Sequence, residues 1–307
     1  MADRQSWPLL VPGAYDAGSA RIVEAAGFPA VAVSGFGISA TLLGRPDAGY
    51  LALPELVYVV GQMARHCSVP LVVDADTGFG NALTVMRTVE ELIGAGAAAI
   101  FIEDQVSPKR CGHVAGKQVI PAEEFVGKIR AADRVRRELD PDLVLIARTD
   151  ARGVSGGSID DVVRRGRLYC EAGADVIFPE GLISAQEIEL CGSDIDAPLI
   201  YNMAGISPRL PLPQLGEWGV FLAALPGITL QASLRGAWDV LHRLKAEGVT
   251  YLQEFEASLV GHPVGELHTF VGFPEVKRLE EEFLPAAEVL ARYEGSLGFS
   301  LDQSGGD

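Results

Sequence analysis

The sequence predicts a (β/α)8 barrel of α/β class followed by a C-terminal helical extension. Eight short apolar runs alternate with helical patterns over residues 1–248, and polar or charged residues follow most of these runs at their ends. A doubly wound open sheet would show a similar alternation, but it usually carries a Gly-rich phosphate turn after its first strand. That stretch reads PGAYDAGSA here, without a GxGxxG pattern, so the barrel is preferred.

The expected elements follow in order along the chain. Strands are expected at 9–13, 30–34, 69–76, 97–104, 142–150, 174–180, 197–203 and 220–225. Helices are expected at 16–26, 54–66, 83–95, 122–138, 160–172 and 231–247. Gly27 ends the first helix and Pro54 opens the second. A polar, Gly-rich loop is expected between residues 34 and 54, and an unusually long one between residue 104 and Pro121.

After Gly248 the pattern changes to a charged helical tail, which includes residues 274–295. A tail beyond a complete barrel has no place in its core. We therefore predict a catalytic domain at 1–248 and a helical extension at 249–307, which covers a neighbouring subunit of an oligomer or closes one end of the barrel.

Composition excludes several classes of protein. The chain has 307 residues and a net charge of −16, which repels nucleic acid and anionic membranes. No basic start followed by an apolar core marks a signal peptide, and no apolar run approaches the ~20 residues of a membrane helix. The four cysteines form no CxxC pair, which is typical of a reduced compartment. A cytoplasmic enzyme without nucleic-acid or membrane partners is expected.

Candidate catalytic groups collect at the ends of the expected strands, where a barrel of this kind holds its active site. They are Ser34, Asp74, Asp76, Glu103, Asp104, Arg148, Asp150, Glu180 and Asn202. So many carboxylates in one place are costly unless a hard cation neutralises them. We predict a metal site at Asp74, Asp76 and Glu103. A helix cap or an arginine partner would explain an isolated DxD, but not the further acids at equivalent strand ends.

Two basic features would favour an anionic substrate. Arg148 suits bidentate capture of a carboxylate, although it could equally be a structural partner of the acids. The long loop SPKRCGHVAGK (107–117) has one thiol, Cys111, at its centre. Loops of this length are usually functional lids. Lys109, Arg110 and His113 are expected to attract anions and to make the thiol more acidic. Cys67, Cys170 and Cys191 are expected to be packing residues, and His66, His242, His262 and His268 have no assigned role.

Four segments, VDADTGFGNA, IEDQVSPKRCGH, ARTDA and FPEG, occur in that order and resemble the isocitrate lyase/phosphoenolpyruvate mutase superfamily. The similarity runs from about Val11 to Gly248, and the KRCGH loop resembles the lyase branch, which includes methylisocitrate and 2,3-dimethylmalate lyases. The resemblance implies a Mg²⁺-dependent barrel, with Mn²⁺ as an alternative ion. It also implies a homotetramer that exchanges its C-terminal helices.

The resemblance also implies a role for each matching residue. Asp74, Asp76 and Glu103 would form the metal site with support from Asp47. Cys111 would be the general acid, acting with Arg148, Glu180 and His113. The substrate-binding set would be Ser34, Gly35, Phe36, Asp47, Gly112 and Asn202. The general base is open, with Tyr15 as one candidate.

The implied reaction is a retro-aldol cleavage of a small 2-hydroxy di- or tricarboxylate to a 2-oxo acid and a carboxylic acid, with Cys111 protonating the carbanion. The chain departs from methylisocitrate lyases at Ala32, where they have tyrosine, at Phe36, where they have glycine, and after Asn202. A substituted malate is therefore a candidate substrate, and Arg209 could replace a lost contact. The alternatives are a carboxyphosphonoenolpyruvate phosphonomutase, an oxaloacetate decarboxylase and a non-catalytic binding or assembly barrel.

Overall fold

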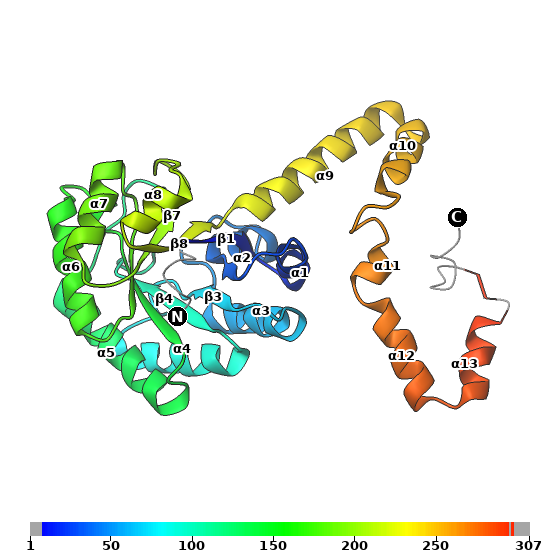
Figure 1. Ribbon diagram of the computed structural model, residues 1–307, viewed down its shortest axis with the longest axis horizontal. Coiled ribbons are helices and arrows are strands. Elements are labelled where there is room, and N and C mark those ends of the chain that lie inside the picture. The colour runs from blue at the N-terminus through cyan, green and yellow to red at the C-terminus, as the bar shows by residue number, and fades with distance from the viewer. Residues whose placement is uncertain (1–7, 295, 298–307) are drawn as a thin grey trace. The chain divides into compact units, whose positions relative to one another are not determined.

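The computed structural model describes residues 8–294 and 296–297. Within these residues, parallel strands pair in chain order and β1 closes the barrel against β8, as Figure 1 shows. The strands are β1 (Leu9–Ala14), β2 (Val31–Val33), β3 (Leu71–Asp74), β4 (Ala99–Glu103), β5 (Val144–Thr149), β6 (Val176–Pro179), β7 (Leu199–Asn202) and β8 (Val220–Leu225). All eight expected strands are confirmed, and the barrel with its helical C-terminal extension is the fold.

The helices surround the strands (Figure 1). They are α1 (Ala17–Ala25), α2 (Gly35–Leu42), α3 (Leu53–His66), α4 (Ala82–Ala95), α5 (Ala122–Leu139), α6 (Ile159–Glu171), α7 (Ala185–Asp194), α8 (Leu212–Glu217) and the start of α9 (Ile228–Glu247). A short 3-10 turn, η2 (Ala151–Gly153), follows β5. Every helix predicted in the barrel is present, with ends displaced by three residues or fewer.

The expectation of a loop after the second strand was wrong, because α2 begins directly at the end of β2. Ser34 caps this helix by accepting a hydrogen bond from the Gly37 backbone N–H at 3.1 Å. Two glycines in its first turn weaken the intrinsic preference for helix. Tertiary packing requires one of them, since a Cβ on Gly37 would lie 2.7 Å from the Cβ of Tyr15.

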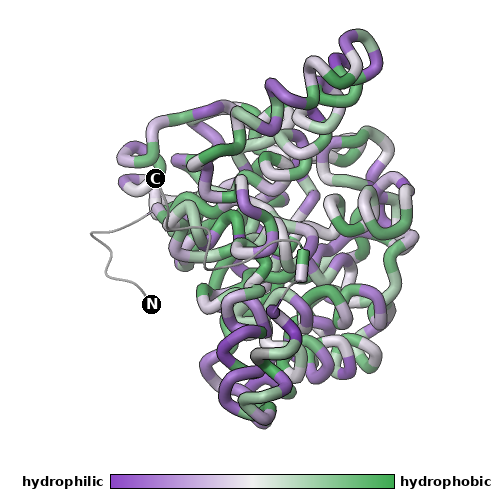
Figure 2. The backbone as a smooth tube through the Cα atoms, turned by 90° about the vertical axis from the view of Figure 1, so that its right-hand side faces the viewer, coloured by the Kyte–Doolittle hydropathy of each residue, from purple (hydrophilic) through white to green (hydrophobic). Residues whose placement is uncertain are grey.

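The core has two apolar layers. Alternate strand residues, such as Val72, Phe101 and Leu222, fill the barrel interior, while residues such as Val73, Ile100 and Ala223 pack outward against the helices. Figure 2 shows hydrophilic and hydrophobic residues interleaved along the helical turns, as expected of helices with one face on a barrel. Because neighbouring strand residues face opposite layers, the strand ends present polar side chains at a defined height above the apolar interior.

The C-terminal part forms a second compact unit, which begins at Leu234 within α9. It continues with α10 (Val249–Leu259), α11 (Leu267–Phe270), α12 (Phe273–Phe283) and α13 (Ala286–Tyr293). In the tail segment that was expected to be helical, α12 and α13 are separated at Leu284 and Pro285, where the backbone of Leu284 is extended. No helix in the described ranges is long and apolar enough to cross a membrane.

Candidate active site

A cavity of about 310 Å³ opens among the carboxyl ends of the strands. The loop between β4 and α5 contributes part of its wall, and the apolar interior of the barrel forms its floor. The predicted site residues that line the cavity are Ser34, Phe36, Asp47, Asp74, Cys111, Gly112, His113, Arg148, Glu180 and Asn202. The strand ends predicted Ser34, Asp74, Arg148, Glu180 and Asn202 among these, the long loop predicted Cys111 and His113, and the family resemblance supplied Phe36, Asp47 and Gly112.

Asp74 and Asp76 point to one place, but not through the alternation of a strand. Asp74 ends β3, whereas Asp76 has a φ of 48°, in the left-handed region. The Asp76 backbone N–H donates to Asp74 Oδ1 at 3.0 Å. A Cβ on Gly35 would lie 3.1 Å from Asp74 Oδ2 and 3.5 Å from Asp76 Oδ1, so both carboxylates lie against Gly35. A tight turn aligns the pair, and a side chain at position 35 would press on Asp74.

Lys109 lies among these carboxylates. Its Nζ is 2.7 Å from Asp47 Oδ1 and 2.7 Å from Asp76 Oδ1, and its side chain is buried. Glu103 is also fully buried, with no hydrogen bond to either carboxylate oxygen and with Arg148 Nε 3.3 Å from Oε2. The loop lysine therefore neutralises only part of the negative charge at the end of β3.

The acidic group is short of positive charge. Burial raises the pKa of Asp74, raises that of Asp76 to about 6 and holds that of Glu103 well above its usual range. Lys109 and Arg148 oppose these shifts without cancelling them. Such a site is relieved by a hard divalent cation that takes carboxylate oxygens.

We tested whether these residues fit Mg²⁺. Asp74 reaches the cavity, the buried oxygens of Glu103 lack hydrogen bonds, and Asp76 Oδ1 has Lys109 as its ionic partner. In the described part of the chain, no three His, Cys, Asp or Glu side chains already form a ligand cage. Mg²⁺ does not need such a cage, since it usually keeps several waters and takes one or two carboxylates. The donor set fits.

Arg148 contacts acids from three strand ends. Its Nε is 2.9 Å from Asp150 Oδ2, and its NH2 is 3.6 Å from Glu180 Oε2. Burial alone would lower the pKa of the guanidinium, but Asp150, Glu103 and Glu180 hold it well above its usual range. The guanidinium also lies 5.1 Å from the centre of the Phe178 ring. Both expected roles, structural partner and cavity cation, are compatible with this position.

The loop 107–117 is fastened over the cavity. The Gln105 side chain bonds both the N–H and the carbonyl of Arg110, and the Cys111 N–H donates to the Asp47 carbonyl at 3.0 Å. The expected acidic thiol is contradicted. Burial, reinforced by Asp47, raises the pKa of Cys111, and the His113 N–H and Lys109 lower it by less. Lys109 is occupied by carboxylates, so the thiol keeps its proton, as a proton donor requires.

His113 joins the loop to two strand ends. Its Nε2 is 3.2 Å from Asn202 Nδ2, and its Nδ1 is 3.9 Å from Glu180 Oε1. Asn202 Nδ2 also donates to Glu180 Oε2 at 3.0 Å. Gly205 lies against the imidazole, because a Cβ there would be 2.2 Å from His113 Nδ1. The segment after Asn202 thus lies against the loop 107–117.

The start of α2 offers hydrogen-bond donors at the cavity wall. Ser34 is buried, and the first N–H groups of a helix have no partner within it. Phe36 lines the cavity from the first turn and is 41% exposed. A carboxylate can bind at such a helix start, with an aromatic ring at its side.

Four residues given a role by the family resemblance do not line the cavity, and neither do the strand-end candidates Asp104 and Asp150. Gly35, Asp76 and Glu103 lie behind it, as described above. The Tyr15 hydroxyl instead donates to Ser233 Oγ at 2.9 Å. Arg209, also considered, is exposed and bonds the carbonyls of Gly205 and Ser207 in its own loop.

Sequence reasoning missed residues that the fold brings to the site. Lys117 is buried and contacts Asp150 through its Nζ at 2.8 Å, although it lies at the very end of the loop. Gln231 lines the cavity from α9, far along the chain. The charge of Lys117 inside an otherwise small-residue stretch was a usable signal, whereas nothing in the local pattern marked Gln231.

The other cysteines have packing environments. Cys67 and Cys191 are buried, and burial raises the pKa of Cys191 to about 12 and that of Cys170 to about 11. Burial also raises the pKa of Cys67. None of the three lines the cavity.

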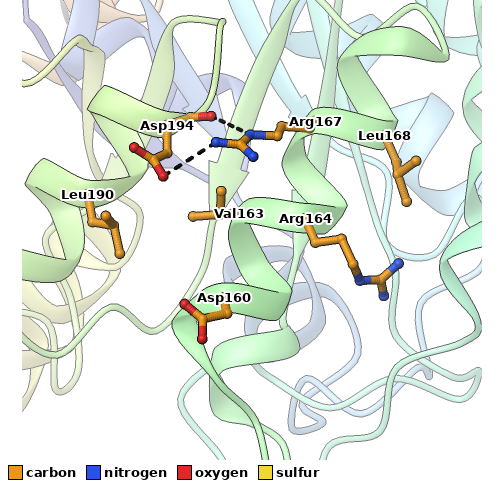
Figure 3. Close-up of a pocket in the computed structure, with 7 residues that line it drawn as sticks. All are labelled: Asp160, Val163, Arg164, Arg167, Leu168, Leu190 and Asp194. Carbon is orange, nitrogen blue, oxygen red and sulfur yellow. Dashed lines mark hydrogen bonds and ion pairs between the residues drawn. The ribbon is translucent and has the colours of Figure 1, made fainter.

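A second hollow lies between α6 and α7 on the outside of the barrel (Figure 3). Arg167 at its edge already bonds the Asp194 carbonyl at 2.7 Å and the Asp194 carboxylate at 3.3 Å. It contains none of the strand-end residues. We assign no function to it.

A model of the family described as phosphoenolpyruvate phosphomutase matches residues 2–244. The chain is 40% identical over 291 residues to 2-methylisocitrate lyase of Aeropyrum pernix, covering 94% of this chain and 91% of that protein. It is 44% identical over 247 residues to chloroplastic carboxyvinyl-carboxyphosphonate phosphorylmutase of Arabidopsis thaliana, covering 79% and 72%. It is 37% identical over 279 residues to 2,3-dimethylmalate lyase of Eubacterium barkeri, covering 90% and 93%.

Solved structures agree. A crystal structure of 2,3-dimethylmalate lyase superposes with a TM-score of 0.83 at 31% identity, covering 95% of this chain and 94% of that one. A phosphonopyruvate hydrolase in complex with oxalate and Mg²⁺ superposes with a TM-score of 0.80 at 30% identity, covering 91% and 95%.

Proposed function

The chain belongs to the phosphoenolpyruvate phosphomutase family, and we propose that it cleaves a small 2-hydroxy di- or tricarboxylate to a 2-oxo acid and a second carboxylic acid. Relatives named as lyases place it among the carbon–carbon lyases of that family. One observation carries the finer proposal: the protonated thiol of Cys111 lines the same cavity as Asp74 and Arg148.

In this proposal, two regions of the cavity hold the substrate. The start of α2, with Ser34 and the Phe36 N–H, would bind the carboxylate that becomes part of the 2-oxo acid. Arg148 would bind the carboxylate at the other end, since it is the guanidinium at the cavity wall. Phe36 would contact an alkyl substituent, which favours a methylisocitrate or a substituted malate over an unbranched acid.

Asp74 would hold Mg²⁺, with Asp47, Asp76 and Glu103 supporting it directly or through water. When bound, the ion would stabilise negative charge on the 2-hydroxyl and its neighbouring carboxylate. The buried oxygens and raised pKa values of Asp76 and Glu103 support this assignment.

Cys111 would protonate the carbanion of the departing acid. Burial keeps its thiol protonated, and the Asp47 carbonyl holds its backbone in place. Glu180 and Asn202 would orient the departing carboxylate together with His113, since the three side chains form one hydrogen-bonded and ionic group. The loop 107–117 would exclude water until protonation is complete.

The test is release of a 2-oxo acid, measured with lactate dehydrogenase and NADH. Methylisocitrate, isocitrate, 2,3-dimethylmalate and other alkylmalates would be compared, each with Mg²⁺ and with EDTA. Cys111→Ala should lose at least about 100-fold in kcat, since general acid catalysis contributes about 10²–10⁴-fold. Cys170→Ala, which removes a thiol outside the cavity, is the matched control and should retain activity.

Two results would refute the proposal. No 2-oxo acid from any of these substrates would remove the lyase assignment for them. Formation of a P–C bond from carboxyphosphonoenolpyruvate, or decarboxylation of oxaloacetate, would then identify a phosphonomutase or a decarboxylase. Full activity in Cys111→Ala would eliminate the thiol as proton donor. Turnover that requires Mg²⁺, is lost in Cys111→Ala and is retained in Cys170→Ala would support the reaction, the metal and the proton donor together.

We also propose that the second unit joins copies of this chain in a homotetramer. Along α9, Leu234, Trp238 and Leu241 recur at helical spacing and are 60%, 65% and 62% exposed. An apolar stripe of this kind indicates a protein interface. Trp238→Glu should lower the molar mass measured by light scattering, and an unchanged mass would contradict this use of α9.

A further inference from the structure

We propose that Lys117 is a positioning residue that latches the loop 107–117 onto β5 and so keeps Cys111 in the cavity. The inference rests on the proposed function only in naming Cys111 as the proton donor. The latch itself is a mechanical contact that can be tested without turnover.

Lys117 makes two contacts from one ammonium group. Its Nζ is 2.8 Å from Asp150 Oδ1, and it also donates to the backbone carbonyl of Gly112. The side chains of Lys117 and Asp150 are 2% and 0% exposed. Gly112 directly follows Cys111, so this ammonium group fixes the peptide next to the thiol.

The other end of the latch is rigid. Asp150 Oδ2 accepts a hydrogen bond from Arg148 Nε at 2.9 Å, and the Asp150 backbone N–H donates to Asp104 Oδ1 at 2.9 Å. Asp104 in turn accepts hydrogen bonds from the Thr149 hydroxyl at 2.7 Å and from the Tyr169 hydroxyl at 2.8 Å. A buried, fully bonded carboxylate of this kind gives Lys117 a fixed anchor.

The loop tip also contacts Arg148 directly. A Cβ on Gly112 would lie 2.4 Å from Arg148 NH2 and 2.9 Å from Glu180 Cγ. The Gly112 backbone therefore lies against the cation that would bind substrate, and Lys117 bonds the carbonyl of the same residue.

The fold provides a slot for the ammonium. A Cβ on Gly153 would lie 2.8 Å from Lys117 Nζ, and no positive φ requires glycine at that position. Gly153→Ala should therefore displace Lys117 without changing any charge. It gives a second, independent way to open the latch.

The experiment measures alkylation of Cys111 by N-ethylmaleimide in the full-length, substrate-free protein, followed by peptide mass spectrometry. Cys170, partly buried in α6, is the internal reference. Lys117→Met and Gly153→Ala should each raise the Cys111 rate relative to Cys170 by about tenfold or more, since a hydrogen bond to a charged group is lost. Trypsin cleavage after Arg110, an exposed loop residue, should accelerate in parallel.

The matched control is Lys128→Met. Lys128 is another buried lysine that donates to a backbone carbonyl, that of Thr77, outside the loop. It should lower overall stability while leaving the Cys111-to-Cys170 ratio at the wild-type value. If Lys128→Met raised the Cys111-to-Cys170 alkylation ratio as much as Lys117→Met, general destabilisation would explain the effect and the proposal would be overturned.

Kinetics provide the second readout. With a substrate identified by the lyase assay, Lys117→Met should lower kcat more than it raises KM, because Arg148 keeps Asp150 while Cys111 is released. An unchanged alkylation ratio in Lys117→Met overturns the latch whether or not the chain is a lyase. A raised ratio with no turnover in the wild type would retain the latch and refute the proposed function instead.

Discussion

Replacing Asp76 by asparagine should change how the stability of the metal-free protein depends on pH. Burial raises the pKa of Asp76 from 3.8 to about 6 in the folded chain. A group with a raised pKa stabilises the fold when it is protonated, and this contribution is lost as pH rises through the folded value. At about 1.4 kcal/mol per pH unit, the full difference corresponds to about 3 kcal/mol.

Part of this effect lies in an accessible pH range. Linkage between the two pKa values puts about 1.4 kcal/mol of it between pH 5 and pH 7.5. The free energy of unfolding of the wild type should therefore fall by about that amount relative to Asp76→Asn over this range. Asp150, whose pKa Arg148 and Lys117 hold at about 2, stays ionised throughout and does not contribute.

The assay is urea unfolding in EDTA at a single protein concentration, at pH 5, 6 and 7.5. Mg²⁺ added at pH 7.5 should stabilise the wild type, by about 2.7 kcal/mol at 100 times its dissociation constant, and should stabilise Asp76→Asn less. Parallel pH curves for the two proteins would refute the raised pKa. Equal stabilisation by Mg²⁺ would refute the part assigned to Asp76 in holding the ion.

Three further substitutions follow from close contacts. Gly112→Ala should reduce kcat at least about 100-fold with little change in the urea midpoint, because its Cβ would lie 2.4 Å from Arg148 NH2; wild-type turnover would show that the loop closes differently. Gly205→Ala places a Cβ 2.2 Å from His113 Nδ1 at a φ of 55°, so steady-state kinetics should show a loss in kcat/KM. Gly156→Ala is the control, because Gly156 also has a positive φ but open space around it, and this variant should keep the wild-type kcat/KM. Asp104→Asn should lower the free energy of unfolding by about 3 kcal/mol, because a buried ion pair is broken; a urea midpoint equal to the wild type would contradict that.

The order of the strands and the residues at their ends could be predicted from the sequence. Strand runs such as AAAIFIED and DLVLIARTD carry their carboxylates at the same end, and parallel strands in a barrel bring those ends together. The cavity residues at the strand ends, Ser34, Asp74, Arg148, Glu180 and Asn202, follow from that single rule, whereas Phe36, Asp47 and Gly112 came from the family resemblance. The helix α2 escaped prediction because two glycines weaken the local preference for helix, and its close packing against Tyr15 is a feature of the fold that the local pattern does not carry.

The local pattern could not show which residues far apart in the sequence come into contact. The pKa of Cys111 depends on burial and on whether Lys109 is free, and Lys109 is held by Asp47 and Asp76, more than thirty positions away in the chain. The Tyr15 hydroxyl bonds Ser233 for the same reason, since the barrel closes first strand to last. Amino-acid type and spacing by themselves determined the barrel, its acidic strand ends and its reactive loop. Tertiary structure decided which charges pair, because pairing energies depend on separations of a few ångströms and on burial, and the closed barrel sets both.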